Sequence, residues 1–201
     1  MAKTREDFKN KLMGYIEDAW AMENQIAQVL EGQIKDLESF PEFQTRIRQH
    51  LEETKLHRKR MAERLSAYGR QPTERLTSEI KGVVGGLLGM ATGALQGMRA
   101  DTLAREVRDD FVTENLEVAA YTMLIACARA FGDDETVQAA EANLREDIQM
   151  QRWLADRLSD AALLSLDQQG IPVPAGDRQP ALDEADAQLR VVFEPIPGLG
   201  V

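Results

Sequence analysis

The stretch LMGYIEDAWAMENQIAQVL, residues 12–30, decides the fold class. Its apolar residues recur at alternating spacings of four and three, which is the period of one face of an α-helix. That face consists of Leu12, Ile16, Ala19, Ile26 and Leu30, with Glu23 among them. The pattern predicts a helix over residues 5–37, with Thr4 as its N-terminal cap.

Three further segments carry the same period. We expect helices over residues 41–68, 101–131 and 133–164, because apolar residues align on one face of each. Gly69 and Gly132 follow the first two of these helices, and glycine commonly ends a helix. The links within the first pair of helices and within the last pair are short, which predicts two antiparallel hairpins.

A stretch of about thirty residues, 70–100, separates the two hairpins. Two helical hairpins joined by one long crossover are typical of an all-α, ferritin-like four-helix bundle. Glycines recur every four residues within the crossover, which predicts a short Gly-rich helix there. These glycines are Gly85, Gly89, Gly93 and Gly97.

The bundle is expected to occupy residues 1–165. Residues 166–201 contain five of the seven prolines and little helical period, so we expect a Pro/Gly-containing C-terminal tail. The net charge of -10 argues against nucleic-acid and anionic-membrane partners, since both require a basic surface. Cys127 is the single cysteine, which excludes a disulfide framework and a thiolate metal site. The polar N-terminus lacks a signal-peptide pattern, so a cytoplasmic location is expected.

Ionisable residues interrupt the apolar faces of all four expected helices. An unpaired carboxylate is costly to bury, so such a residue needs a partner or a metal ion. His50, Glu53 and His57 project to one face of the second helix, and these two histidines are the only ones in the chain. The candidate metal ligands are Glu23, His50, Glu53, His57, Glu114, Glu117, Glu146 and Asp147.

A weak internal repeat supports this set. Glu23 precedes Glu53 by 30 residues, and Glu117 precedes Asp147 by the same interval, so each hairpin brings two carboxylates to a similar depth. Carboxylates from four helices with added imidazole form the ligand set of di-iron and di-manganese bundles. The alternative is that the inward carboxylates pair with arginines, for example Glu114 with Arg152, and that one acid of the Glu52/Glu53 pair is solvated. Either Glu146 or Asp147 can be the inward member of its pair.

Four blocks of sequence resemble the YciE/YciF-like branch of the ferritin-like superfamily, a family of largely unknown function. The blocks are DAWAMENQI (18–26), HLEETKLH (50–57), TENLEVAAY (113–121) and NLREDIQMQRWL (143–154). The resemblance implies a ferritin-like bundle, a homodimer, a link to bacterial stress responses and a di-metal centre at the acidic core positions.

Two functions of different classes follow from these observations. The first is a non-haem di-iron or di-manganese carboxylate protein of the oxidative or general stress response. If it is an enzyme, it would be a ferroxidase- or peroxidase-like oxidoreductase acting on dioxygen or peroxide, without haem or nucleotide. The second is a non-catalytic helical bundle that binds a partner and retains a vestigial metal site. Gln151 replaces the histidine expected from the repeat, so the second metal position is expected to be the weaker one.

Overall fold

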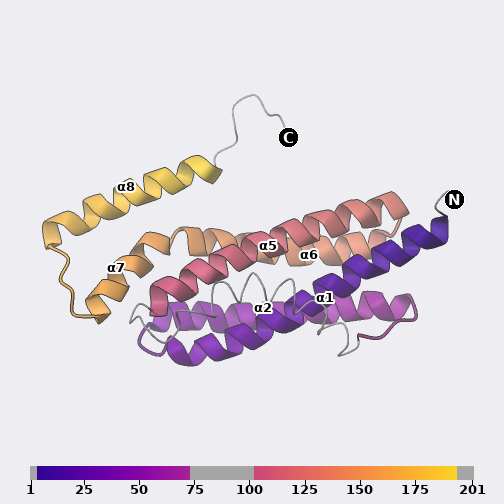
Figure 1. Ribbon diagram of the computed structural model, residues 1–201, viewed down its shortest axis with the longest axis horizontal. Helices are drawn as coiled ribbons and strands as arrows, with labels where there is room; N and C mark the ends of the chain where they lie inside the picture. The colour runs from indigo at the N-terminus through magenta and orange to yellow at the C-terminus, as the bar shows by residue number, and fades with distance from the viewer. Residues whose placement is uncertain (1–3, 73–101, 194–201) are drawn as a thin grey trace.

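The computed structural model describes residues 4–72 and 102–193, and this part of the chain contains six helices and no strand (Figure 1). Helix α1 spans Arg5–Asp36 and α2 spans Pro41–Ala67. Helix α5 spans Thr102–Phe131 and α6 spans Asp134–Ala155. The predicted Gly-rich helix of the crossover lies outside the described residues.

Helices α1, α2, α5 and α6 form a four-helix bundle. Helix α1 packs most extensively on α2, and α5 on α6, so each pair is a hairpin closed by a short link. The hairpins meet through α1 against α5 and α2 against α6. The all-α, ferritin-like fold class predicted from the helical periods is confirmed. The shared core contains Leu12, Ile16, Ile47, Met61, Leu124 and Met150, all fully or almost fully buried.

The helix ends follow the local signals in the sequence. Thr4 and Asp7 form a capping box at the start of α1, where the Thr4 hydroxyl accepts from the Asp7 amide at 3.2 Å. Gly69 and Gly132 stand just beyond α2 and α5 with φ of +74° and +83°. Side chains other than glycine rarely adopt this conformation, so both glycines end their helices as predicted.

The predicted fourth helix is two helices. Helix α6 ends at Ala155, and α7 begins at Leu158 and ends at Gln168. The break lets α7 pack on α5, where the Ser165 hydroxyl accepts from the Ala104 amide at 3.0 Å. The single helix expected over residues 133–164 is therefore corrected, because the apolar period continues across the bend and does not reveal it.

A further helix, α8, spans Ala175–Phe193 within the predicted tail. It packs on α7 and lies apart from the four bundle helices (Figure 1). Its described side chains are mostly exposed, so it has no apolar face from which the period could be read. The division into a bundle and a tail stays a prediction. By length and composition alone, α5 is the one helix of the described residues that qualifies as a membrane-span candidate.

Candidate metal centre

The four bundle helices each contribute side chains to a buried polar cluster at mid-height of the core. Glu23 of α1, His57 of α2, Glu117 of α5 and Asp147 of α6 each offer a ligand atom, and these atoms lie within 4.8 Å of one another. A second group of the same compactness consists of His50, Glu114 and Glu117. All six residues are buried, and Glu117 belongs to both groups.

His57 presents one ring nitrogen to the first group and the other to an outer carboxylate. Its Nδ1 lies 3.4 Å from Glu23 Oε1 and 3.3 Å from Asp147 Oδ1. Its Nε2 lies 2.6 Å from Glu146 Oε2, which also accepts from Arg60 Nη1 at 3.0 Å. A proton on Nε2 donated to Glu146 leaves the Nδ1 lone pair facing the cluster.

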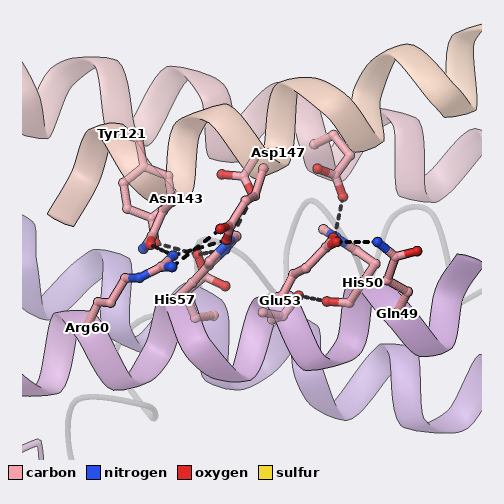
Figure 2. A network of polar contacts seen from close by, with 12 residues as sticks. Gln49, His50, Glu53, His57, Arg60, Tyr121, Asn143 and Asp147 are labelled. Carbon is pink, nitrogen blue, oxygen red and sulfur yellow. Dashed lines mark hydrogen bonds and ion pairs between the residues drawn. The ribbon is translucent and has the colours of Figure 1, made fainter. Parts of the chain in front are cut away.

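His50 repeats this arrangement with its two nitrogens exchanged. Its Nε2 lies 2.7 Å from Glu114 Oε1 in the second group. Its Nδ1 lies 3.1 Å from Glu53 Oε2, which accepts from Arg46 Nη1 at 3.0 Å. Figure 2 shows the two histidines at separate positions along α2 with Glu53 between them, and Asp147 of the opposite hairpin beside His57. Each histidine is therefore oriented by a carboxylate that an arginine holds in place.

Six of the eight predicted residues meet in the two groups, and two lie at the edge. The Glu53 and Glu146 side chains are 22% and 30% exposed and pair with arginines. Asp147, which is fully buried, is thus the inward member of the Glu146/Asp147 pair. Metal binding by the eight residues stays a prediction. Arginine pairing, the alternative expected from sequence, occurs at the two outer carboxylates.

The suggested partner of Glu114 was Arg152, and the structure places them apart. Arg152 is exposed, whereas Glu114 is buried against His50. Arg46 and Arg60 are the arginines that reach the outer edge of the cluster, and neither was singled out from the sequence. The sequence did contain a signal, namely their spacing on the second helix: Arg46 lies seven residues before Glu53, and Arg60 lies three residues after His57.

Tyr121 and Asn143 extend the cluster on the side of α5 and α6. The Tyr121 hydroxyl donates to Glu23 Oε1 in a short hydrogen bond and accepts from Asn143 Nδ2 at 2.7 Å. Asn143 Oδ1 in turn accepts from Arg60 Nη1 at 2.8 Å. Asn143 escapes sequence analysis because an uncharged amide on a helix face gives no signal of its own. Together these bonds fix the orientation of the Glu23 carboxylate.

The charges of the cluster act strongly on the two histidines. Burial alone would lower the pKa of His50, but the neighbouring carboxylates, chiefly Glu114, outweigh it and raise that pKa to about 10. Burial opposes ionisation of His57 as well, yet Glu23 and the other acids around it raise its pKa to about 9. The histidines are thus in an environment that attracts positive charge.

The carboxylates show the converse effect. Burial, and next the charges of Glu114 and Asp147, raise the pKa of Glu117 well above its usual range. Burial and the charge of Glu23 do the same to the pKa of Asp147. Burial and the neighbouring carboxylates disfavour ionisation of both groups, and at Asp147 they outweigh the opposing charges of His57 and His50.

Six buried carboxylate oxygens of the cluster have no hydrogen-bond partner in the described part of the protein. They are Glu23 Oε2, Glu114 Oε2, both oxygens of Glu117 and both oxygens of Asp147. Orphaned buried acceptors of this kind are costly, and a coordinated cation satisfies them. Hard oxygen donors with two imidazoles fit iron or manganese, so the residues present suit such a centre.

Known structures share this architecture. A Xanthomonas campestris protein is 24% identical with a TM-score of 0.66, covering 81% of this chain and 99% of its own. YcfI from Rhodopseudomonas palustris is 26% identical with a TM-score of 0.61, covering 76% of this chain and 93% of its own. The Escherichia coli stress protein YciF is 17% identical with a TM-score of 0.61, covering 83% of this chain and 99% of its own.

The first and the last of these likenesses, both under 25% identical, show the fold alone. The model of the family described as a domain of unknown function, DUF892, matches residues 7–165. This range contains all four bundle helices and every residue of the buried cluster. The resemblance drawn from the four sequence blocks is confirmed, and the chain belongs to the DUF892 family.

Proposed function

We propose that this chain is a non-haem di-metal carboxylate protein that binds iron or manganese and serves the oxidative or general stress response. The observation that carries the proposal is the convergence of six buried ligand residues from four helices, with carboxylate oxygens left unpaired. A stress role is supported by the fold shared with the YciF stress protein. A cytoplasmic homodimer belongs to the same proposal.

Each residue has a distinct role in this proposal. Glu117 stands in both ligand groups, so it would bridge the two ions. His57 and His50 would each supply a neutral nitrogen, one to each ion. When bound, a pair of iron or manganese ions supplies redox chemistry toward dioxygen or peroxide. The protein holds the ligands rigidly, because every one of them lies on a helix of the packed bundle.

The two proposed metal positions differ in their expected affinity for a metal ion. The first group has four ligand residues and the second has three, one of them shared. Fewer protein ligands mean weaker binding and more positions left for water or a substrate. We therefore propose that the position near His57 fills first and that the position near His50 is the exchangeable one.

Metal content tests the proposal directly. The full-length protein, loaded anaerobically with Fe²⁺ or Mn²⁺ and desalted, is compared with a Glu23→Ala/Glu117→Ala variant by inductively coupled plasma mass spectrometry. A Glu52→Ala/Glu63→Ala variant, which removes two exposed carboxylates of α2, is the matched control. We expect metal in the wild type and the control and its loss from the cluster variant, with all three equally helical by circular dichroism.

A folded wild-type protein that retains no iron or manganese after loading would refute the proposal. The remaining candidate would then be a partner-binding bundle with a vestigial site, and sedimentation with partner capture would test it. A cluster variant that binds as much metal as the wild type would show that the metal lies elsewhere.

A further inference from the structure

A cavity of about 660 Å³ lies between α1 and α5, on the side of the cluster nearest the end of α1. Four carboxylates border it, Asp36 of α1 and Glu106, Asp109 and Asp110 of α5, against a single cationic residue of its described lining, Arg105. We call this cavity the acidic cleft. It is separate from the six ligand residues, none of which lines it.

Two polar residues of the acidic cleft are buried and incompletely bonded. Asp110 is 6% exposed and Gln33 is 8% exposed, and Gln33 Nε2 donates to Asp110 Oδ1 at 2.7 Å. The other oxygens, Asp110 Oδ2 and Gln33 Oε1, are buried without a hydrogen-bond partner in the described residues. The same is true of Glu106 Oε2. Three unsatisfied oxygen acceptors therefore line one cavity, which a bound cation would satisfy.

The carboxylates of the cleft also repel one another. Glu106 and Asp110 are four residues apart on α5, so they are neighbours on one helix face. Burial, and then the Asp110 charge, raise the pKa of Glu106 to about 8. Burial raises the pKa of Asp110 to about 7. A divalent cation between them would offset both the burial cost and the repulsion.

The cleft leads to the metal cluster along α5. Asp110 lies one helical turn before Glu114, and Glu114 lies one turn before Glu117. The charges of Glu114 and His50 both act on Asp110, which places it beside the weaker ligand group. An uninterrupted series of carboxylates thus runs from the cavity to the bridging position.

We propose that the acidic cleft is a divalent-cation entry site, from which Asp110 transfers incoming cations to the Glu114 and Glu117 carboxylates. This inference rests on the proposed function, since it assigns the route by which the centre is loaded. The donor set of carboxylate and amide oxygens suits Mn²⁺ or Fe²⁺. Within residues 4–72 and 102–193, no third acid, histidine or cysteine lies close enough to complete a ligand group with Glu106 and Asp110. The entry site therefore binds its cation weakly and releases it inward. No covalent or redox step is involved.

Rapid mixing of the metal-free full-length protein with Mn²⁺ tests the route. Loss of the free Mn²⁺ electron paramagnetic resonance signal reports uptake, and the return of this signal after displacement by excess diamagnetic Zn²⁺ reports release. The test variant is Glu106→Gln/Asp110→Asn, and Glu52→Gln/Glu63→Gln on exposed α2 positions removes the same charge elsewhere. We expect the cleft variant to load and to release about tenfold or more slowly, and the control to match the wild type. The final Mn²⁺ stoichiometry should be equal in all three.

The outcomes separate the two proposals. Wild-type protein that takes up neither Mn²⁺ nor, under anaerobic conditions, Fe²⁺ refutes the proposed function and the entry route together. Wild-type rates in the cleft variant refute the entry route alone. Lower final stoichiometry at an unchanged rate also refutes it, because Asp110 would then be a ligand of the centre. Should the double variant fold poorly, Glu106→Gln alone, whose side chain lies farther from the cluster along α5, is expected to slow loading in the same direction.

Discussion

Replacing Glu117 by glutamine is expected to stabilise the metal-free protein and to remove its stabilisation by metal. Both oxygens of Glu117 are buried and lack a hydrogen-bond partner, and each unsatisfied buried group costs about 1–3 kcal/mol. Glutamine preserves the shape of the side chain and supplies an N–H₂ group. This group can donate to the oxygens of Glu114 or Asp147, which also lack partners.

We expect the free energy of unfolding of the metal-free Glu117→Gln variant to rise by about 2 kcal/mol. For a chain of this size that corresponds to a melting temperature about 4–8 °C higher. Urea and thermal unfolding followed by circular dichroism measure both quantities. Glu141→Gln, at a partly exposed position on α6 that pairs with Arg129, is the control and should change stability by no more than about 0.5 kcal/mol.

The gain should depend on pH. Burial and neighbouring charges raise the pKa of Glu117 well above its usual range in the folded protein. Below the unfolded pKa of about 4.3, Glu117 is protonated in both states and its full contribution to stability is present. As the pH rises through the pKa of the folded state, that contribution is lost, because the buried carboxyl resists ionisation. Glutamine does not titrate, so the advantage of the variant should be small near pH 4 and larger at pH 8.

Metal should reverse the order of stability. A ligand present at 100 times its Kd adds about 2.7 kcal/mol to the stability of the protein that binds it. Saturating Mn²⁺ should therefore stabilise the wild type by that amount and the variant by much less. The reasoning fails if Glu117→Gln destabilises the metal-free protein at pH 8, since Glu117 would then have a favourable partner within the protein. Equal stabilisation of both proteins by Mn²⁺ would exclude Glu117 as a ligand.

Four further outcomes are expected. Glu146→Gln should weaken metal binding by roughly 10–100-fold in calorimetric titrations, because Glu146 orients the ring of His57 from outside the cluster. Gly132→Ala should cost about 1–2 kcal/mol in urea unfolding, since its φ is +83°. Gly14→Ala should instead add about 0.5–1 kcal/mol, because no atom lies within 4 Å of the added Cβ and the position is helical. Deleting residues 171–201 should leave metal content and melting temperature unchanged, because α8 packs on α7 and lies apart from the four bundle helices (Figure 1); loss of metal on deletion would show that the tail supports the site.

The helices and most of their ends could be predicted from the sequence because their causes are local. The apolar period that defines α1 is contained in residues 12–30, and Gly69 and Gly132 end their helices through their own backbone conformation. The ionisable residues that interrupt the apolar helix faces also indicated a buried polar cluster. Helix α8 lacked such a signal, since a helix without a buried face has no apolar period.

Tertiary packing decides which of the adjacent residues Glu146 and Asp147 points into the core. Adjacent residues of a helix point about 100° apart, so both lie near the edge of the same stripe. Which one enters the core depends on the rotation of α6 against α2, where Arg60 draws Glu146 outward. Glu53 is held at the edge in the same way by Arg46.

The acidic cleft shows the same division between local pattern and packing. Gln33 and Asp110 are separated by 77 residues, and nothing in the sequence relates one to the other. They meet because α1 packs on α5, and this contact is set by the way the two hairpins associate. The sequence by itself determined that four helices form the bundle and that their buried faces carry acids and histidines. Only the tertiary structure decided which of those groups face one another, because the burial of distant helix faces, and no local preference, selects their contacts.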